Sequence, residues 1–309
     1  SIMQNTKVIG LKENKNSVKI VLENVNNKKI QEVTSKYIVG CDGANSTIRK
    51  QIKSKFQNLG FTQKWAVIDL ILKKDKKELP DRTIQYSNSK RPATYCRNVG
   101  KRRRWEFAIH NSESEKQVLS NSYIWKFLKP WLKPRDAYME RKTIYTFQSA
   151  ISKKWRKGRV FLAGDAAHLM PPFMGQGMCA GIRDASNLAW KIALCLKNNL
   201  SEKLLDTYQS ERYSNVKEYI KTTVKMGEFV NAIGSSNITG EVSSTPDGQK
   251  SMKSIKPKLG KGLGKVQDKN RGKIFPQFKF NSKKSLDNKF SLKPILILSK
   301  EIKKNISNR

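Results

Sequence analysis

The stretch between residues 158 and 197 constrains the fold more than any other part of the chain. Its apolar run 160–163 predicts a short buried strand that ends at a Gly-Asp pair. Two prolines and two glycines follow, and then a helical pattern begins at Gly177. Such a loop places the free N–H groups of the helix and the positive end of its dipole against a ligand. We therefore predict a site for a negatively charged group at this helix N-terminus.

The predicted helix, residues 177–197, carries small and apolar side chains at helical spacing, and a second helical pattern covers residues 204–230. The stripe expected to face the core of the first helix consists of Gly181, Ala185, Leu188, Ile192 and Leu196. Small residues at the start of that stripe allow its first turns to approach another segment closely. From residue 231 to 272 the Gly, Ser, Lys and Pro content rises, which predicts a long loop.

A second segment has the same design as the first. Residues 37–41 predict a buried strand, and Asp42 and Gly43 follow it directly. Ligands of open α/β sheets bind beyond the carboxyl ends of the strands, where a carboxylate can accept hydrogen bonds from sugar-type hydroxyls. Asp-Gly is also an ordinary turn sequence, so a plain turn is an equally good interpretation of Asp42-Gly43 alone.

Other segments have the alternating pattern of antiparallel strands. Residues 6–11 and 17–22 predict a hairpin, and residues 65–72 and 104–109 predict strands of a mainly antiparallel sheet between about 61 and 150. Trp65, Trp105 and Trp190 are expected in the core rather than at a substrate.

The segment GRVFLAGDAAHLMPPFMGQGMCAGIRDASNLAWKIA, residues 158–193, resembles the "GD" motif of the para-hydroxybenzoate hydroxylase superfamily of class A flavoprotein monooxygenases. YIVGCDGANSTIR, residues 37–49, resembles the "DG" motif of that superfamily. FTQKWAVIDL (61–70), RPAT (91–94), RRRWEF (102–107) and GKIFPQ (272–277) resemble the 3-(3-hydroxyphenyl)propionate hydroxylases within it.

The resemblance implies an α/β fold: a partial FAD-binding domain with an inserted, mainly antiparallel β-sheet domain for the substrate. Residues 1–60 and 151–230 would form the FAD-binding part, and residues 61–150 the substrate domain. Residues 231–309 would form a loop and a C-terminal extension.

The resemblance also assigns roles to single residues. Asp165 would bind the ribityl chain of FAD, and Gly164 would let it approach. The flavin edge would lie against Gly175, Gln176, Gly177 and Met178. Pro171 and Pro172 would separate the flavin from an aromatic substrate. Asp42, Gly43 and Arg49 would lie near the pyrophosphate and the path of the nicotinamide.

Two interpretations stay open for each of two polar positions. His168 would either contact the nicotinamide nucleotide or make a structural hydrogen bond. For Arg183-Asp184 an ion pair within the helix or to the sheet is favoured over a functional role. The sequence contains no GxGxxG after a strand, since the GKGLG of residues 260–264 lacks one. The chain therefore resembles a fragment that starts after such a unit, and we expect it to bind FAD weakly alone.

The net charge of +37 raises nucleic acid as a partner. The charge is concentrated away from the motifs: residues 250–309 contain 18 Lys and Arg against three Asp and Glu. A solvated lysine-rich surface is therefore favoured, with no nucleic-acid partner. No apolar run is long enough to predict a membrane span. Four cysteines without a CxxC pair favour free thiols and a cytoplasmic location.

The favoured function is hydroxylation of a phenolic acid similar to 3-(3-hydroxyphenyl)propionate, with FAD as cofactor and with NADH or NADPH and O2 as co-substrates. A homodimer is a further expectation. A non-catalytic basic binding protein and an inactive fragment of such an enzyme are the alternatives. A flavin halogenase or a geranylgeranyl-type reductase fits less well, because RRRWEF and PPFMGQGM match the hydroxylase subgroup.

Overall fold

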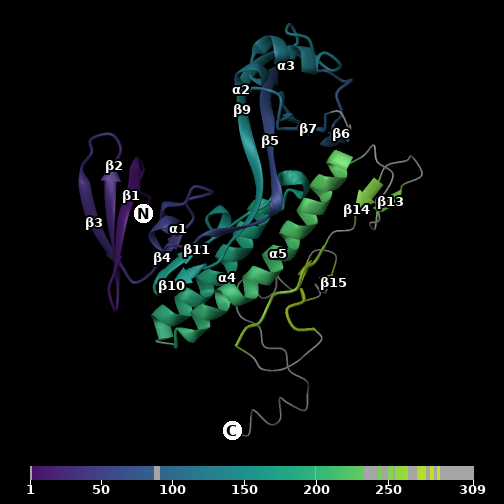
Figure 1. The fold of residues 1–309 in the computed structure, drawn as a ribbon. Helices are drawn as coiled ribbons and strands as arrows, with labels where there is room; N and C mark the ends of the chain where they lie inside the picture. Colours follow the sequence, from purple (N-terminus) through teal and green to yellow (C-terminus); the bar gives the residue numbers. More distant parts are fainter. Residues whose placement is uncertain are drawn as a thin grey trace. The chain divides into compact units, whose positions relative to one another are not determined.

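A computed structural model gives the fold of the chain (Figure 1). It describes residues 2–86, 91–198, 200–232, 242–244, 250–252, 255–263, 270–275, 279–281 and 284–285. The chain divides into two compact units, Ser1–Gly272 and Lys273–Arg309. In the second unit, β15 (Lys279–Asn281) and β16 (Lys284–Ser285) pair antiparallel. All elements that form the site belong to the first unit.

The two short apolar runs form a pair of parallel strands. β4 (Ile38–Gly40) lies beside β11 (Val160–Leu162), with Gly40 opposite Leu162. β10 (Arg156–Lys157) adds to the other side of β11 and gives the order β10-β11-β4. The three side chains of β11 are buried, as the apolar run predicted. β4 is an edge of this sheet, and its Val39 is 38% exposed.

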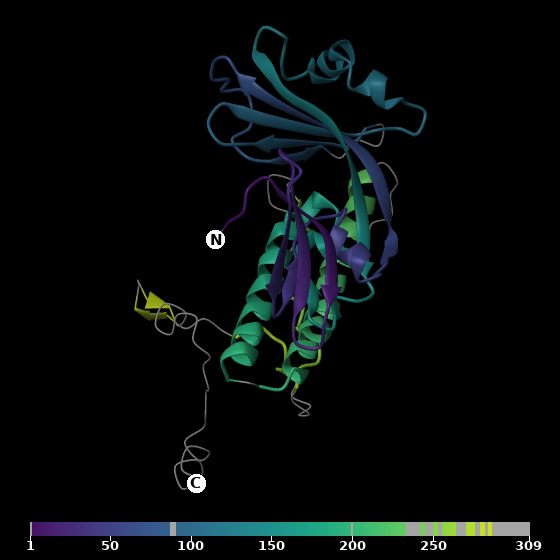
Figure 2. The same cartoon turned by 90° about the vertical axis from the view of Figure 1, so that its left-hand side faces the viewer.

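A separate antiparallel sheet lies near the N-terminus and is drawn in purple in Figure 2. Its strands are β1 (Thr6–Glu13), β2 (Val18–Asn24) and β3 (Ile30–Ser35), in that order. The predicted hairpin of β1 and β2 is confirmed. β3 was not predicted, because most of its side chains are exposed and it lacks a regular apolar alternation.

The predicted antiparallel sheet has six strands in the order β12-β9-β5-β8-β7-β6. They are β5 (Phe56–Leu72), β6 (Ile84–Tyr86), β7 (Ala93–Arg97), β8 (Arg102–Ala108), β9 (Ala137–Ser152) and β12 (His168–Leu169). β5 and β9 run past the expected domain limits at residues 61 and 150. The division into four parts therefore stays a prediction, and these two strands connect the sheet directly to the parallel pair.

One face of this sheet forms a core under α2 (Glu115–Val118) and α3 (Asn121–Leu128). Trp105 is fully buried in that core between Tyr95 and Trp131. Trp65 is fully buried on the other face of the sheet. The core positions predicted for these two tryptophans are confirmed.

Two long helices lie side by side (Figures 1 and 2). α4 (Gln176–Asn198) and α5 (Lys203–Ala232) match the predicted helices to within two residues at each end. The stripe predicted for α4 is wrong in part, since Ala185 and Leu196 are exposed. The buried residues of α4 are Ala180, Asp184, Leu188, Lys191 and Cys195. Two of them are charged, and both are paired in the interior, so hydropathy alone misplaced the buried face.

The rotation of α4 also leaves Trp190 with 44% of its surface exposed, so its predicted core position is wrong. The outward face of α4 instead shows an uncharged stripe at helical spacing, with Met178, Ile182 and Leu196 exposed by 76%, 60% and 42%. Within the part of the chain that the structure describes, no helix is long and apolar enough to cross a membrane.

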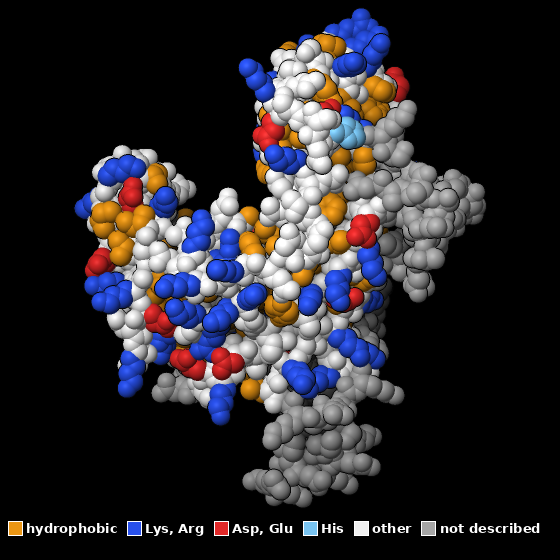
Figure 3. Space-filling view, viewed as in Figure 1, with side chains coloured by type: hydrophobic (Ala, Val, Ile, Leu, Met, Phe, Trp, Pro, Cys, Tyr) orange, Lys and Arg blue, Asp and Glu red, His pale blue; other side chains and the backbone are white. Residues whose placement is uncertain are grey.

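The region predicted as a loop has some regular structure. β13 (Val242–Ser244) and β14 (Lys250–Met252) form a short hairpin, and residues 255–263 contact α5 through a hydrogen bond from Gly260 N to Glu211 O (2.8 Å). Most lysines of the basic C-terminal stretch lie outside the described residues. On the face shown in Figure 3, Lys and Arg side chains are dispersed over the surface and interspersed with Asp and Glu.

Candidate flavin site

The two strand ends that the sequence singles out meet at one edge of the parallel sheet. A hydrogen bond from Ala163 N to Gly40 O (3.0 Å) continues the pairing of β11 with β4. The Asp42-Gly43 turn and the Gly164-Asp165 turn consequently follow neighbouring strands on the same side. This is the place where ligands bind in open α/β sheets.

The Gly164 turn is closely packed on its inner side. Gly164 has a left-handed backbone (φ 59°), and a Cβ on Gly181 of α4 would lie 3.3 Å from its Cα. Residues Gly164–Ala166 form one turn of 3₁₀ helix. Asp165 is exposed and has no hydrogen-bond partner among the described residues. The turn therefore presents a free carboxylate outward from a tightly fixed backbone.

The Asp42 turn is organised by its own side chains. The Asp42 carboxylate accepts hydrogen bonds from Ser46 Oγ (2.5 Å) and Ile48 N (3.0 Å), at the start of α1 (Thr47–Gln51). Gly43 has φ 80°, and no atom lies within 4 Å of the place its Cβ would take. Asp42 thus stabilises a turn and a helix start, and Gly43 leaves open space beside it.

Arg49 lies between the two turns, with only 7% of its surface exposed. Its guanidinium donates to Ala166 O (3.0 Å) and Ala44 O (2.6 Å) and covers the Phe56 ring at 3.8 Å. Burial lowers the pKa of Arg49, and the nearby Asp42 opposes that shift. The side chain holds the turns together, and its burial leaves it little surface for a nicotinamide.

The start of α4 faces open space. Pro171 is buried and Pro172 is exposed, and a 3₁₀ turn, Pro172–Met174, leads to Gly175, which has φ 60° and no atom within 4 Å of a Cβ position. The first N–H groups of a helix have no acceptor within it. Among the described residues, the backbone N–H groups of Gln176, Gly177 and Met178 have no other acceptor.

The Gln176 side chain turns back rather than outward. Its Nε2 donates to Met174 O (3.4 Å), and its Oε1 accepts from both terminal nitrogens of Arg183 (3.3 Å each). Arg183 also covers the Tyr219 ring at 5.0 Å. Arg183 therefore has structural partners, as favoured, and it does not pair with Asp184.

His168 is 1% exposed, and its Nε2 lies 2.6 Å from Asp184 Oδ2. The structure contains the structural hydrogen bond, and the buried ring has little surface for a nucleotide. The nicotinamide contact stays a prediction. Sequence reasoning did not identify Asp184 as the partner of His168. The only sequence signal for Asp184 was its place in the Arg183-Asp184 pair.

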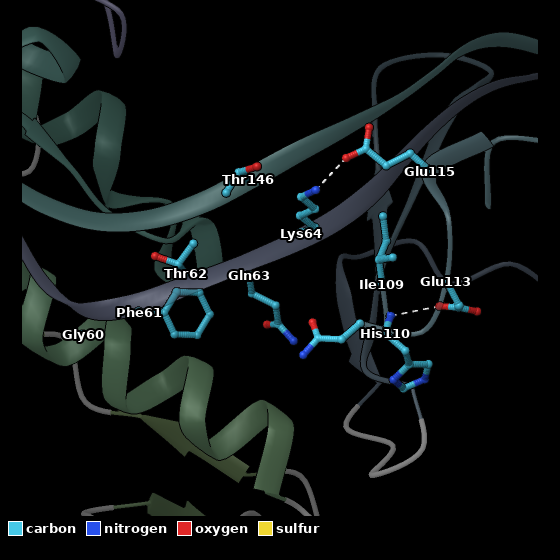
Figure 4. Close-up of a pocket in the computed structure, with 11 residues that line it drawn as sticks. Gly60, Phe61, Thr62, Gln63, Lys64, Ile109, His110, Glu113, Glu115 and Thr146 are labelled. Carbon is cyan, nitrogen blue, oxygen red and sulfur yellow. Dashed lines mark hydrogen bonds and ion pairs between the residues drawn. The ribbon is translucent and has the colours of Figure 1, made fainter. Parts of the chain in front are cut away.

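Phe173 is the second residue that sequence reasoning missed. Its ring contacts Phe61 and Trp65 at 5.6 and 5.7 Å between centroids, which fixes the proline loop on the antiparallel sheet. A cavity of about 640 Å³ lies beside Phe61, along the edge of β5 where β8 has ended (Figure 4). In Figure 4, Gln63 points toward the loop that carries His110.

These features fit the flavin half of FAD. Open space lies beside Gly43 and Gly175, a free carboxylate stands at Asp165, and free N–H groups stand at the start of α4. The helix that follows β4, α1, has only five residues and no GxGxxG turn before it, so the described residues do not account for the adenosine half. The described residues contain no group of three or more His, Cys, Asp or Glu that could hold a metal.

Comparisons with known proteins agree with this geometry. A family model described as "FAD binding domain" matches residues 1–223. The probable NADH-specific resorcinol 4-hydroxylase of Rhodococcus jostii is 35% identical over 79% of this chain and 46% of that protein. The 3-(3-hydroxy-phenyl)propionate/3-hydroxycinnamic acid hydroxylase of Mycolicibacterium smegmatis is 36% identical over 64% of this chain and 35% of that protein. The chain thus spans less than half the length of these relatives.

Solved structures share the fold. Aklavinone-11 hydroxylase, in a ternary complex with FAD and aklavinone, has a TM-score of 0.67 at 19% identity and covers 74% of this chain and 45% of that one. The p-nitrophenol 4-monooxygenase PnpA of Pseudomonas putida has a TM-score of 0.63 at 21% identity, over 74% and 61% of the two chains. The predicted α/β fold with an inserted antiparallel sheet is confirmed.

Proposed function

Because this chain belongs to the FAD-binding domain family, we propose that it supplies the flavin-ring half of an FAD-dependent enzyme that hydroxylates a phenolic ring, with NADH or NADPH and O2 as co-substrates. One observation carries the proposal. The unpartnered carboxylate of Asp165 and the free N–H groups of α4 lie at the two ends of one fixed segment, beside the meeting point of two parallel strands.

Asp165 accepts hydrogen bonds from the ribityl hydroxyls, and the left-handed Gly164 lets the chain of FAD come close. The N–H groups of Gln176, Gly177 and Met178 stabilise negative charge on the flavin edge through hydrogen bonds and the helix dipole. The chemistry that bound FAD supplies is acceptance of a hydride from the nicotinamide and activation of O2 for transfer of one oxygen atom to the ring.

Pro171 and Pro172 form the wall between flavin and substrate. Phe173, Phe61, Trp65 and Phe147 pack behind this wall as one aromatic cluster. The cluster excludes water from the reacting face, which protects oxygen transfer from hydrolytic side reactions. An uncharged aromatic ring is the ligand that such a surface favours.

The names of two relatives support a substrate class. Both of those described above are named as hydroxylases of phenols, one for resorcinol and one for a phenolic acid. We propose a phenol of this size, with the ring beside Pro172 and Phe173. A phenolic acid such as 3-(3-hydroxyphenyl)propionate is one such substrate.

Titration of FAD into the chain, followed by flavin fluorescence, tests this proposal. Asp165→Asn removes one charge without changing the side-chain shape, and Asp75→Asn is the matched control at an exposed carboxylate in the loop that follows β5. Loss of a charge-assisted hydrogen bond costs about 1.5–3 kcal/mol, so we expect Asp165→Asn to weaken FAD binding about ten- to hundredfold. Equal affinities of Asp165→Asn, the control and the unsubstituted chain would overturn the proposal.

A further inference from the structure

Asp184, on α4, is a fully buried carboxylate that lies behind the Gly164 turn. Its Oδ2 accepts hydrogen bonds from Gly164 N (3.1 Å) and from the Nε2 of His168 (2.6 Å). Its Oδ1 accepts from the Nε of Arg212 on α5 (2.8 Å). One carboxylate therefore receives three donors.

Two of the three donors belong to the same loop. Gly164 begins the segment that carries Asp165, and His168 ends it, so the Oδ2 of Asp184 holds the segment at both ends. His168 is fixed further by Trp155, whose ring lies 5.3 Å away. Its Nδ1 is buried without a partner, so the Nε2 contact is the polar contact that orients the ring.

The third donor, Arg212, fixes Asp184 to α5. Arg212 is 2% exposed and also donates to Asn215 Oδ1 (2.7 Å) and to Ala180 O (3.3 Å). Burial would raise the pKa of Asp184, but the hydrogen bonds and charges of His168 and Arg212 lower it. Asp184 is thus held as a carboxylate with its acceptor sites occupied.

We infer that Asp184 is a positioning residue of the flavin site, which fixes Gly164 and His168 so that the intervening Asp165 carboxylate is preorganised for FAD. The inference rests on the proposed function. Asp184 itself touches no open space, so it acts through the loop. A carboxylate that must meet a ligand hydroxyl within hydrogen-bond distance gains affinity when its backbone is fixed before binding.

A second buried pair on the same helices provides a matched comparison. Lys191, also fully buried on α4, donates to Glu211 Oε2 (2.6 Å) and Thr207 Oγ1 (2.7 Å) of α5. This cluster joins α4 to α5 as the Asp184–Arg212 pair does, but it has no contact with the Gly164 loop. A purely structural role of Asp184 predicts that both sites behave alike.

The test compares Asp184→Asn with Lys191→Met in the full chain, by thermal melts, FAD titration and amide hydrogen exchange without ligand. We expect both substitutions to lower the melting temperature. Only Asp184→Asn should speed exchange over residues 163–168, and only it should weaken FAD binding, by about tenfold or more. His168→Phe keeps an aromatic ring and the charge of Asp184 but removes the Nε2 donor, and it should give a smaller loss of the same kind if Asp184→Asn does not fold.

The outcomes separate the two proposals. Faster exchange over residues 163–168 with unchanged FAD affinity would overturn the positioning role, as would equal effects of Asp184→Asn and Lys191→Met on affinity. If the unsubstituted chain shows no FAD binding, the proposed function fails, and unchanged exchange over this loop in Asp184→Asn would then also remove the structural basis of the inference.

Discussion

Arg49 donates a hydrogen bond from its buried guanidinium to the carbonyl of Ala166, 117 residues later in the chain (3.0 Å). The same guanidinium holds Ala44 O, in the turn after β4. One side chain thus joins both turns of the candidate site, and the stability of the site depends on it.

We therefore expect Arg49→Lys to lower the free energy of unfolding by about 1.5–3 kcal/mol, since one ammonium cannot replace a planar group that serves two carbonyls and an aromatic ring. Urea denaturation measures the change. Arg135→Lys is the control, because Arg135 is exposed, and it should change stability very little. A similar small effect for both would show that the two turns are joined by other means.

Gly164 is required by its backbone. At φ 59° an added Cβ strains the chain by about 1–2 kcal/mol, so Gly164→Ala should destabilise by about that amount. Gly10→Ala serves as the control: its Cβ would meet Val21 at 3.7 Å, an ordinary contact, and φ of Gly10 is not left-handed. If urea denaturation gives equal stability for Gly164→Ala and the unsubstituted chain, the turn tolerates another conformation.

Glu113, in the loop between β8 and α2, contributes to the stability of the six-stranded sheet in acid. Burial alone would raise its pKa, but hydrogen bonds from Arg91, Tyr123 and His110 N outweigh that effect and lower the pKa to about 2. A carboxyl with a lowered pKa in the folded state stabilises the protein above its unfolded pKa, and this contribution disappears as the pH falls from 4.5 to about 2.

We expect Glu113→Gln to be less stable than the unsubstituted chain at neutral pH, and the difference to shrink steadily below pH 4.5. Denaturation with urea over a pH series measures it. Glu115→Gln, at a side chain 55% exposed, should show no comparable effect. A difference that stays constant down to pH 2 would contradict the assignment of the lowered pKa.

The uncharged outward stripe of α4 predicts self-association. Exposed apolar patches of this kind promote contacts between molecules. Ile182→Lys combined with Leu196→Lys should reduce association in light scattering, whereas Val99→Lys, at a side chain 89% exposed but isolated, should not. If the unsubstituted chain, the double variant and Val99→Lys associate equally, the association involves another surface.

Sequence patterns predicted the elements of the site well because each has strong local signals. The apolar runs of β4 and β11 are short and are followed by turns with Gly and Asp, and Gly175 and Gly177 indicate the start of α4. Their meeting at one edge follows from parallel pairing, which any α/β arrangement of two such strands produces.

Long-range polar contacts could not be predicted. Asp184 and Lys191 are buried charges, and their partners Arg212 and Glu211 lie one helix further along the chain. Hydropathy places such residues on the surface. The predicted buried face of α4 is therefore rotated relative to the observed one, and Trp190 is wrongly predicted in the core. His168 was left open for the same reason, since the choice depended on whether Asp184 lay within reach.

The most direct test of the site is a map of the amides that FAD protects from hydrogen exchange. We predict protection at residues 41–46, 163–168 and 175–178, which surround the ends of β4 and β11 and the start of α4. Addition of ADP at the same concentration is the control for phosphate binding to the basic surface, and it should not protect residues 163–168. Protection by FAD confined to the lysine-rich residues after 250, and reproduced by ADP, would contradict the flavin site and favour a basic binding protein.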